Sequence, residues 1–165
     1  MSFNWVFILI FIELIFVGWI DFKTHKISNR WVFLNIGLSI VFHLFIQHLY
    51  PLSWEVLIFP IGFIGIGFFL FLLNIMGAGD SKFLASLFLI VPLEFHMPFF
   101  EKILVSTLIN GSILILAKTL FHRRTLYAYF ISRYWNGIKE IIRSRISYAP
   151  VIVLAWLLLG IELWT

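Results

Sequence analysis

The sequence predicts an all-α membrane protein with about six transmembrane helices, forming a single domain over residues 1–165. Composition, length and the spacing of apolar runs all predict this class. The 165 residues are 62% hydrophobic and 12% charged, with a mean hydropathy of +1.03. An average soluble domain is about half apolar and about a quarter charged. Since each spanning helix needs roughly 20 apolar residues, the chain has little left for a soluble domain.

The first three expected spans lie between clear interruptions. The run over residues 3–20 ends at the charged stretch DFKTHK. A cleaved signal peptide begins with basic residues, but here no basic residue precedes Lys23, so this run is expected to be a retained helix. The second span, 31–49, ends before the turn residues YPLS. The third, 54–75, ends at MGAGDSK. Each apolar run is long enough for a hydropathy window of about 19 residues.

The last three expected spans are less uniform. The fourth, 83–100, is interrupted by PLEFHMP and is expected to be short, tilted or partly re-entrant. The fifth, 103–121, follows Lys102 and carries Lys118 near its end. The sixth, 147–164, follows a long basic stretch. Pro150 suits the start of this span, because the N–H groups of the first helical turn have no partner within the helix and the missing N–H of proline costs nothing.

The basic residues predict the orientation. Eleven of the 12 Lys and Arg residues fall on one side of the six spans, which the positive-inside rule makes cytoplasmic, so both termini are expected outside. Residues 122–146 are expected to form a basic amphipathic cytoplasmic loop that lies on membrane lipids or docks a partner. No nucleic-acid partner is expected, because the charge lies where topology alone requires it.

The chain has two aspartates, Asp21 and Asp80, which follow the first and third spans. This topology places both near the cytoplasmic boundary, although 59 positions separate them. Two carboxyl groups that share a site share one proton, and that arrangement serves an aspartic protease. The alternative is structural: Asp80 caps the next helix and Asp21 pairs with a nearby lysine. Spacing alone leaves both interpretations open.

Other residue types restrict the chemistry further. The chain has no cysteine, which excludes disulfides, thiolate zinc sites and a cysteine nucleophile. Its five histidines show no metal-ligand spacing, so neither a metal nor a cofactor is expected. Gly77 and Gly79 are expected to adopt positive φ or to approach a substrate strand closely. Lys82 is expected to offset negative charge near Asp80.

Three segments of the sequence, in order, resemble the prepilin peptidases, a branch of the GxGD membrane aspartyl proteases. GAGDSK, residues 77–82, is similar to the Gly-x-Gly-Asp-x-Lys signature of that family. DFKTHKISN, residues 21–29, is similar to its first-aspartate motif, and ISYAP, residues 146–150, to a late segment that opens the last helix. The resemblance covers most of the chain, and the ordered set is much more specific than GxGD alone.

The resemblance implies a six-helix enzyme of the prokaryotic inner membrane with a cytoplasmic active site. It implies that Asp21 and Asp80 are catalytic and that the substrates are prepilin or pseudopilin precursors with short basic leaders. The missing cysteines and the short chain are similar to the peptidase-only form of tight-adherence pilus systems. Ser28 replaces a commoner proline. The alternatives are a presenilin-like intramembrane protease and a non-enzymatic transport or assembly subunit. The oligomeric state stays open.

Three polar residues have open roles. Asn29 is expected either to orient the first loop and bond the substrate backbone or to cap the second span. Lys26 either tunes the site or is a plain topological charge. Glu13 lies in the middle of the first span, within FIELIF, where an interhelical hydrogen bond is the expected role.

Overall fold

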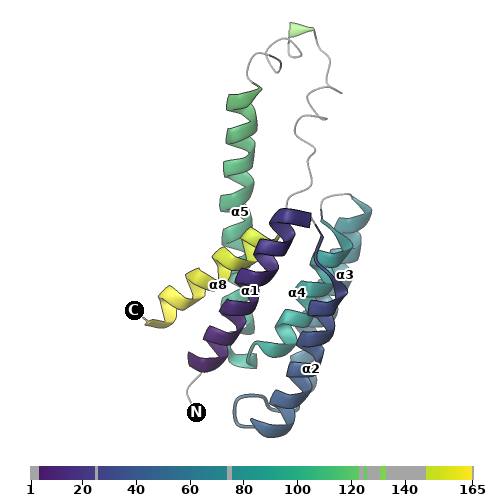
Figure 1. Ribbon diagram of the computed structural model, residues 1–165, viewed down its shortest axis with the longest axis vertical. Helices are drawn as coiled ribbons and strands as arrows, with labels where there is room; N and C mark the ends of the chain where they lie inside the picture. The colour runs from purple at the N-terminus through teal and green to yellow at the C-terminus, as the bar shows by residue number, and fades with distance from the viewer. Residues whose placement is uncertain are drawn as a thin grey trace.

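The computed structural model describes residues 4–24, 26–73, 76–122, 125, 131–132 and 148–164. Regular structure in these ranges is helical, which confirms the predicted all-α class. Long helices run in alternating directions along the molecule (Figure 1). The predicted basic loop 122–146 lies almost entirely outside the described residues. The elements are α1 (Asn4–Thr24), α2 (Asn29–Phe45), the 3₁₀ helix η1 (Trp54–Leu57), α3 (Ile58–Leu72), α4 (Ala78–Ile90), the 3₁₀ helix η2 (Leu93–Phe95), α5 (His96–Phe121) and α8 (Ala149–Trp164).

The boundaries predicted for the fourth span are wrong. The expected segment 83–100 is divided, because α4 ends at Ile90 and residues 96–100 begin α5. Pro92 causes the break: it has no N–H, and its ring disfavours a helical conformation at Val91. Val91 is extended, with φ −78° and ψ 129°. As a result α4 has 13 residues, fewer than the roughly 20 that a perpendicular span needs.

The helices pack most extensively in two groups. In the α2–α3–α4 group, α4 packs against both of its partners, and in the α1–α5–α8 group, α8 does the same. The backbones of α3 and α4 come so close that a Cβ atom at Gly67 would overlap the side chain of Ser81. Glycine at that position therefore allows the close α3–α4 packing, and α4 becomes the central helix of its group.

Aromatic side chains join the two groups into one core. Phe88 of α4 stacks on Phe59 of α3 with 5.1 Å between ring centroids and meets Phe99 of α5 at 5.3 Å. Phe99 in turn meets the ring of Trp156 in α8 edge-on at 5.0 Å. The indole N–H of Trp156 donates to the Phe7 carbonyl oxygen of α1 at 3.2 Å. The core therefore continues from α3 through α4, α5 and α8 to α1.

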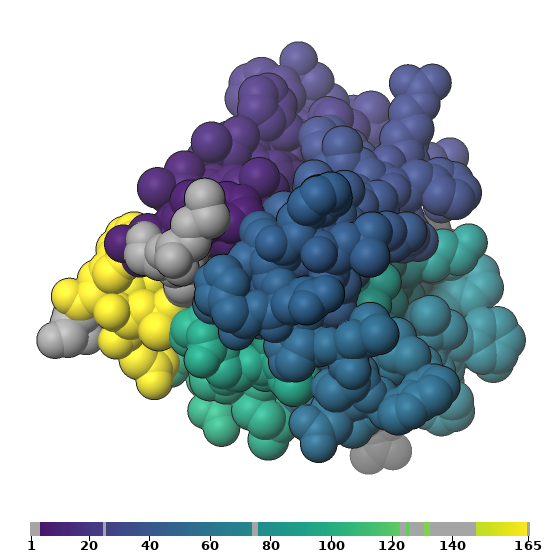
Figure 2. Space-filling model, turned by 90° about the horizontal axis from the view of Figure 1, so that it is seen from below, coloured from purple at the N-terminus to yellow at the C-terminus, as the bar shows by residue number. Residues whose placement is uncertain are grey.

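Side chains outside α4 bind carbonyl oxygens at its C-terminal end. The Tyr50 hydroxyl donates to the carbonyl oxygen of Ile90 at 2.7 Å, and a ring nitrogen of His96 lies 3.0 Å from that of Val91. These contacts give partners to carbonyl groups that a helix end otherwise leaves unpaired. Seen from this end of the molecule, the segment that joins α2 to η1 occupies the middle of the surface (Figure 2).

The outer surface is strongly apolar. Three described segments are long and apolar enough to cross a membrane: Asn4–Thr24, Trp54–Leu72 and Leu93–Phe121. Helices α2 and α8 are apolar but shorter. An apolar surface of this extent is unfavourable in water, so it indicates a membrane protein. The most exposed large apolar side chains include Phe22, Phe33, Phe45, Leu52, Trp54, Leu108, Leu120 and Phe121.

Candidate active site

Asp21 and Asp80 lie at the same end of the molecule. Asp21 is in the last turn of α1, and Asp80 is in the first turn of α4, which runs back in the opposite direction (Figure 1). The Asp21 side chain is 3% exposed, and Asp80 is partly buried. The charge of Asp21 acts on the Asp80 carboxyl group. The fold thus brings together two side chains that are far apart in the sequence, one from each helix group.

The local structure at Asp80 is a helix start. Gly77 is the N-cap residue of α4, and its backbone N–H donates to Asp80 Oδ2 at 3.3 Å. Asp80 is therefore the third residue of the helix and not its N-cap, although it does contribute to capping. The structural alternative is correct in part, and capping leaves the second carboxylate oxygen of Asp80 available for other contacts.

The Asp80 carboxyl group binds its proton more tightly than an ordinary aspartate does. Burial raises its pKa to about 6, and the negative charge of Asp21 acts in the same direction. The hydrogen bond from the Gly77 N–H opposes both effects because it favours the ionised form. A carboxyl group with this pKa is able to hold or release a proton near neutral pH, which acid–base catalysis requires.

Gly79 allows the loop after α1 to lie on the start of α4. A Cβ atom at Gly79 would lie 2.9 Å from the carbonyl oxygen of Ile27, too close for any other residue without a shift. The predicted positive φ is wrong, since φ of Gly77 is −76° and Gly79 also lies outside the left-handed region. The close approach is real, but it is to the chain's own backbone. The predicted approach of a substrate strand to this backbone stays a prediction.

Ser28, and not Asn29, caps the start of α2. Ser28 is the N-cap residue, with φ −74° and ψ 141°, and its Oγ accepts the N–H of Arg30 at 3.3 Å. Asn29 is the first helical residue and its side chain is exposed. The interpretation of Asn29 as the cap is therefore wrong, because Ser28 takes that role. Contact of Asn29 with a substrate stays a prediction.

The predicted lysines lie in different surroundings. Lys26 is exposed in the loop between α1 and α2. Lys82 is also exposed and borders a cavity of about 100 Å³ that Phe68 and Phe71 of α3 line. Because Asp80 precedes Lys82 by two residues on a helix, their side chains leave the axis in different directions. A role for either lysine toward the aspartates stays a prediction.

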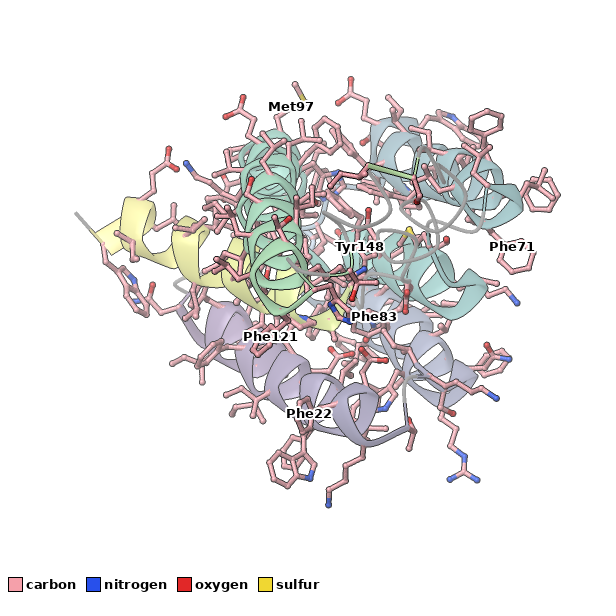
Figure 3. All side chains as sticks on the ribbon, turned by 90° about the horizontal axis from the view of Figure 1, so that it is seen from above. Phe22, Phe71, Phe83, Met97, Phe121 and Tyr148 are labelled. Carbon is pink, nitrogen blue, oxygen red and sulfur yellow. The ribbon has the colours of Figure 1, made fainter. Side chains whose placement is uncertain are left out.

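The structure adds Tyr148 to this site. Its side chain is 8% exposed, immediately before α8, and it interacts electrostatically with Asp80. Tyr148 and Phe83 lie near the middle of the molecule, whereas Phe22 and Phe71 lie toward its edge (Figure 3). The sequence signal for Tyr148 is the ISYAP segment, whose resemblance to a motif does not by itself give the tyrosine a role.

The described residues show no group of three His, Asp or Glu side chains that could hold a metal ion. Asp21 and Asp80 interact electrostatically, the Gly77 N–H donates to Asp80, and Tyr148 also interacts electrostatically with Asp80. The arrangement suits proton exchange with a bound water molecule and a polarised carbonyl group.

Comparison with known proteins identifies the family. The model of the type IV leader peptidase family matches residues 8–164, a range that includes both aspartates and Tyr148. No curated protein and no solved structure matches the chain. Since the family match covers nearly the whole sequence, the chain belongs to the type IV leader peptidase family.

Proposed function

We propose that the protein is an aspartic endopeptidase that removes the short basic leader from type IV prepilin or pseudopilin precursors. Membership of the leader peptidase family supports a peptidase that acts on leader-bearing precursors. The observation that carries the aspartic mechanism is the interaction between Asp21 and Asp80 across the two helix groups. A pair of carboxyl groups that share one proton is the minimum required for this chemistry.

Each carboxyl group has a distinct role in the proposed reaction. Asp21, as the carboxylate, takes a proton from a water molecule, whose oxygen attacks the carbonyl carbon of the scissile peptide bond. Asp80, whose raised pKa favours the protonated form, donates a hydrogen bond to the carbonyl oxygen. The tetrahedral intermediate then collapses: the C–N bond breaks and the proton passes to the leaving amine. The pair returns to its singly protonated state.

The residues beside the pair have supporting roles in this proposal. Gly79 supports the site by letting the Ile27 carbonyl oxygen lie against the start of α4, and Gly77, which has no side chain, leaves backbone that an extended precursor segment can approach. Asn29, exposed at the first position of α2, is positioned to bond the precursor backbone. Lys26 and Lys82 contribute positive charge at this end of the molecule. None of these roles requires a metal or cofactor.

The charge distribution supports a cytoplasmic location for the site. The end of the molecule that carries the aspartates also carries Lys23, Arg30 and Lys82. The positive-inside rule places such an end on the cytoplasmic side of a bilayer. We propose a multi-pass protein of a prokaryotic inner membrane, with the leader cleaved at the cytoplasmic surface.

Cleavage of a synthetic precursor by the purified, membrane-reconstituted protein tests the proposal. The precursor carries a short basic leader followed by an apolar helix, and mass spectrometry locates the cleaved bond. Asp21→Asn and Asp80→Asn are each expected to lower cleavage by roughly 10²- to 10⁴-fold. Glu55→Gln, an equivalent carboxyl-to-amide change on the exposed η1 at the opposite end, is expected to have no effect.

Three outcomes would overturn the proposal. Full processing by either aspartate variant rejects the aspartic pair. Cleavage inside the apolar helix, away from the leader boundary, favours a presenilin-like protease. A wild-type protein that binds the precursor without cleaving it favours an assembly subunit.

A further inference from the structure

Glu13 is a buried carboxyl group that the proposed reaction does not use. It lies on α1, eight residues before Asp21, which corresponds to about 12 Å along the helix axis. Its side chain is 5% exposed, and neither of its carboxyl oxygens has a hydrogen-bond partner among the described residues. Buried polar groups are almost always paired, so an unpaired carboxyl group in the middle of a span requires an explanation.

The neighbour of Glu13 is Asn35 of α2, whose side chain is fully buried. The two side chains lie close enough to interact, although not in an ideal hydrogen-bond geometry. Asn35 Nδ2 donates to Ser86 Oγ of α4 at 3.2 Å, and Ser86 Oγ donates to the Phe83 carbonyl oxygen at 2.8 Å. Because Ser86 has a single hydroxyl hydrogen and uses it on Phe83, it must accept from Asn35.

This order of donors fixes the Asn35 amide. Its nitrogen faces Ser86, and its oxygen, Oδ1, is buried without a partner in the described part of the chain. The second hydrogen of Asn35 Nδ2 is able to bond either form of Glu13, but Oδ1 only accepts hydrogen bonds, and an ionised carboxylate has no hydrogen to donate to it. A neutral carboxylic acid at Glu13 has the missing donor.

We propose that Glu13 is held as a neutral carboxylic acid, donates its proton to Asn35 Oδ1, and thereby positions Asp21 opposite Asp80. No described basic residue pairs with Glu13, and an uncompensated charge at this depth would be costly. The neutral acid completes a chain of hydrogen bonds from α1 through α2 to α4. Polar contacts of this kind hold helices together where the hydrophobic effect cannot.

The positioning role follows from where this chain of hydrogen bonds runs. Glu13 belongs to the α1–α5–α8 group, whereas Asn35 and Ser86 belong to the α2–α3–α4 group. Asp21 and Asp80 interact electrostatically across the same boundary. Since Glu13 shares a helix with Asp21, and Ser86 shares one with Asp80, the contact fixes how far α1 can slide or rotate against α4. Glu13 is therefore a positioning residue and does not touch the precursor.

Two substitutions separate the hydrogen bond from the carboxyl group itself. Glu13→Gln keeps a donor for Asn35 Oδ1, whereas Glu13→Leu removes it at similar size. If the proposed function is right, E13L lowers kcat of precursor cleavage by roughly tenfold or more, because small displacements of reacting groups cost large factors, and leaves KM nearly unchanged. E13Q restores kcat. Ile12→Gln, at an exposed neighbouring position on α1, controls for an added amide and leaves kcat unchanged.

Two spectroscopic measurements are independent of cleavage. The infrared carbonyl band of a protonated carboxylic acid is expected in the wild-type protein at neutral pH, and it is expected to be weaker in E13Q, where only the proton held by the aspartate pair contributes. The chain has only two aspartates, so ¹³C-labelled aspartate gives carboxyl resonances for Asp21 and Asp80 alone. Both resonances are expected to move in E13L and to stay in place in E13Q. If E13L does not fold, Asn35→Leu, which removes the acceptor, is expected to behave in the same way.

The outcomes are separable. An unchanged infrared band in E13Q, or aspartate resonances that move as much in E13Q as in E13L, would overturn the inference. A wild-type protein that shows the band and the resonance pattern but cleaves no precursor would instead overturn the proposed function.

Discussion

The carbonyl oxygen of Ile27 lies directly on Gly79, with no space for a Cβ atom between the two backbones. This contact fastens the loop that follows Asp21 to the turn of α4 that carries Asp80. Neither residue takes part in the proposed chemistry. The contact nevertheless determines how the end of α1 sits against the start of α4, and it explains why a glycine adjoins the second aspartate.

Gly79→Ala is expected to lower cleavage by roughly 10- to 100-fold, because the added Cβ, 2.9 Å from the Ile27 oxygen, displaces the loop beside Asp21. The matched control is Gly62→Ala in α3, where a Cβ atom would meet nothing within 4 Å. Initial rates of precursor cleavage and the thermal midpoint of both variants provide the measurement. Equal activity of the two variants would show that the Ile27 contact does not position the site.

Cleavage is expected to decline as the pH rises through about 6. The pKa of Asp80 is raised to about 6, so Asp80 keeps its proton below about pH 6 and loses it above that pH. Loss of the shared proton removes the hydrogen bond to the scissile carbonyl. The dependence of kcat/KM on pH reports this ionisation in the free enzyme. A rate that rises steadily from pH 5 to pH 8 would contradict the assignment of the acid to Asp80.

Asp21→Asn is expected to lower the pKa of Asp80. The charge of Asp21 disfavours ionisation of Asp80, and the neutral amide removes that effect while burial remains. Because Asp80 is then the single aspartate in the chain, ¹³C-aspartate labelling of this variant follows one carboxyl group through a pH titration. An unchanged Asp80 pKa, relative to the wild-type protein, would mean that the two groups do not share a site.

Tyr148→Phe is expected to move the decline of kcat/KM toward higher pH. Removal of the hydroxyl leaves apolar surface near Asp80, which disfavours its ionised form. Tyr50→Phe is the matched control, because Tyr50 is also buried but bonds the Ile90 carbonyl at the other end of α4. The control is expected to reduce thermal stability by about 1 kcal/mol without moving the pH profile. Identical pH profiles for all three proteins would exclude Tyr148 from the site.

Much of the helical layout was predictable because hydropathy identifies the apolar segments that are removed from water. The first, second and last helices begin within a few residues of the predicted positions, and the two aspartates were expected at one end from the parity of the spans. The break at Pro92 was visible as an irregularity. Hydropathy averages over a window, however, so it merged α4 with the start of α5 and placed the end of a helix ten residues too late.

Contacts between helices were not predictable from the same pattern. An apolar run is apolar on every side, so the sequence does not show which face of α4 meets α3 or which glycine meets a neighbouring backbone. The meeting of Ile27 and Gly79 depends on a loop conformation that Ser28, not Asn29, sets by capping α2. The approach of Glu13 to Asn35 likewise depends on helix rotation, which single-residue polarity leaves open.

The pairing of α1 with α8 has a consequence for biosynthesis. Helix α1 is made long before α8, yet α8 is its most extensive packing partner among the described helices. A nascent chain that stops before residue 149 already contains both aspartates but lacks the surface that anchors one of them. The proposed peptidase activity should therefore appear only once α8 has entered the bilayer, and truncation before residue 149 should abolish cleavage although it leaves both aspartates in place.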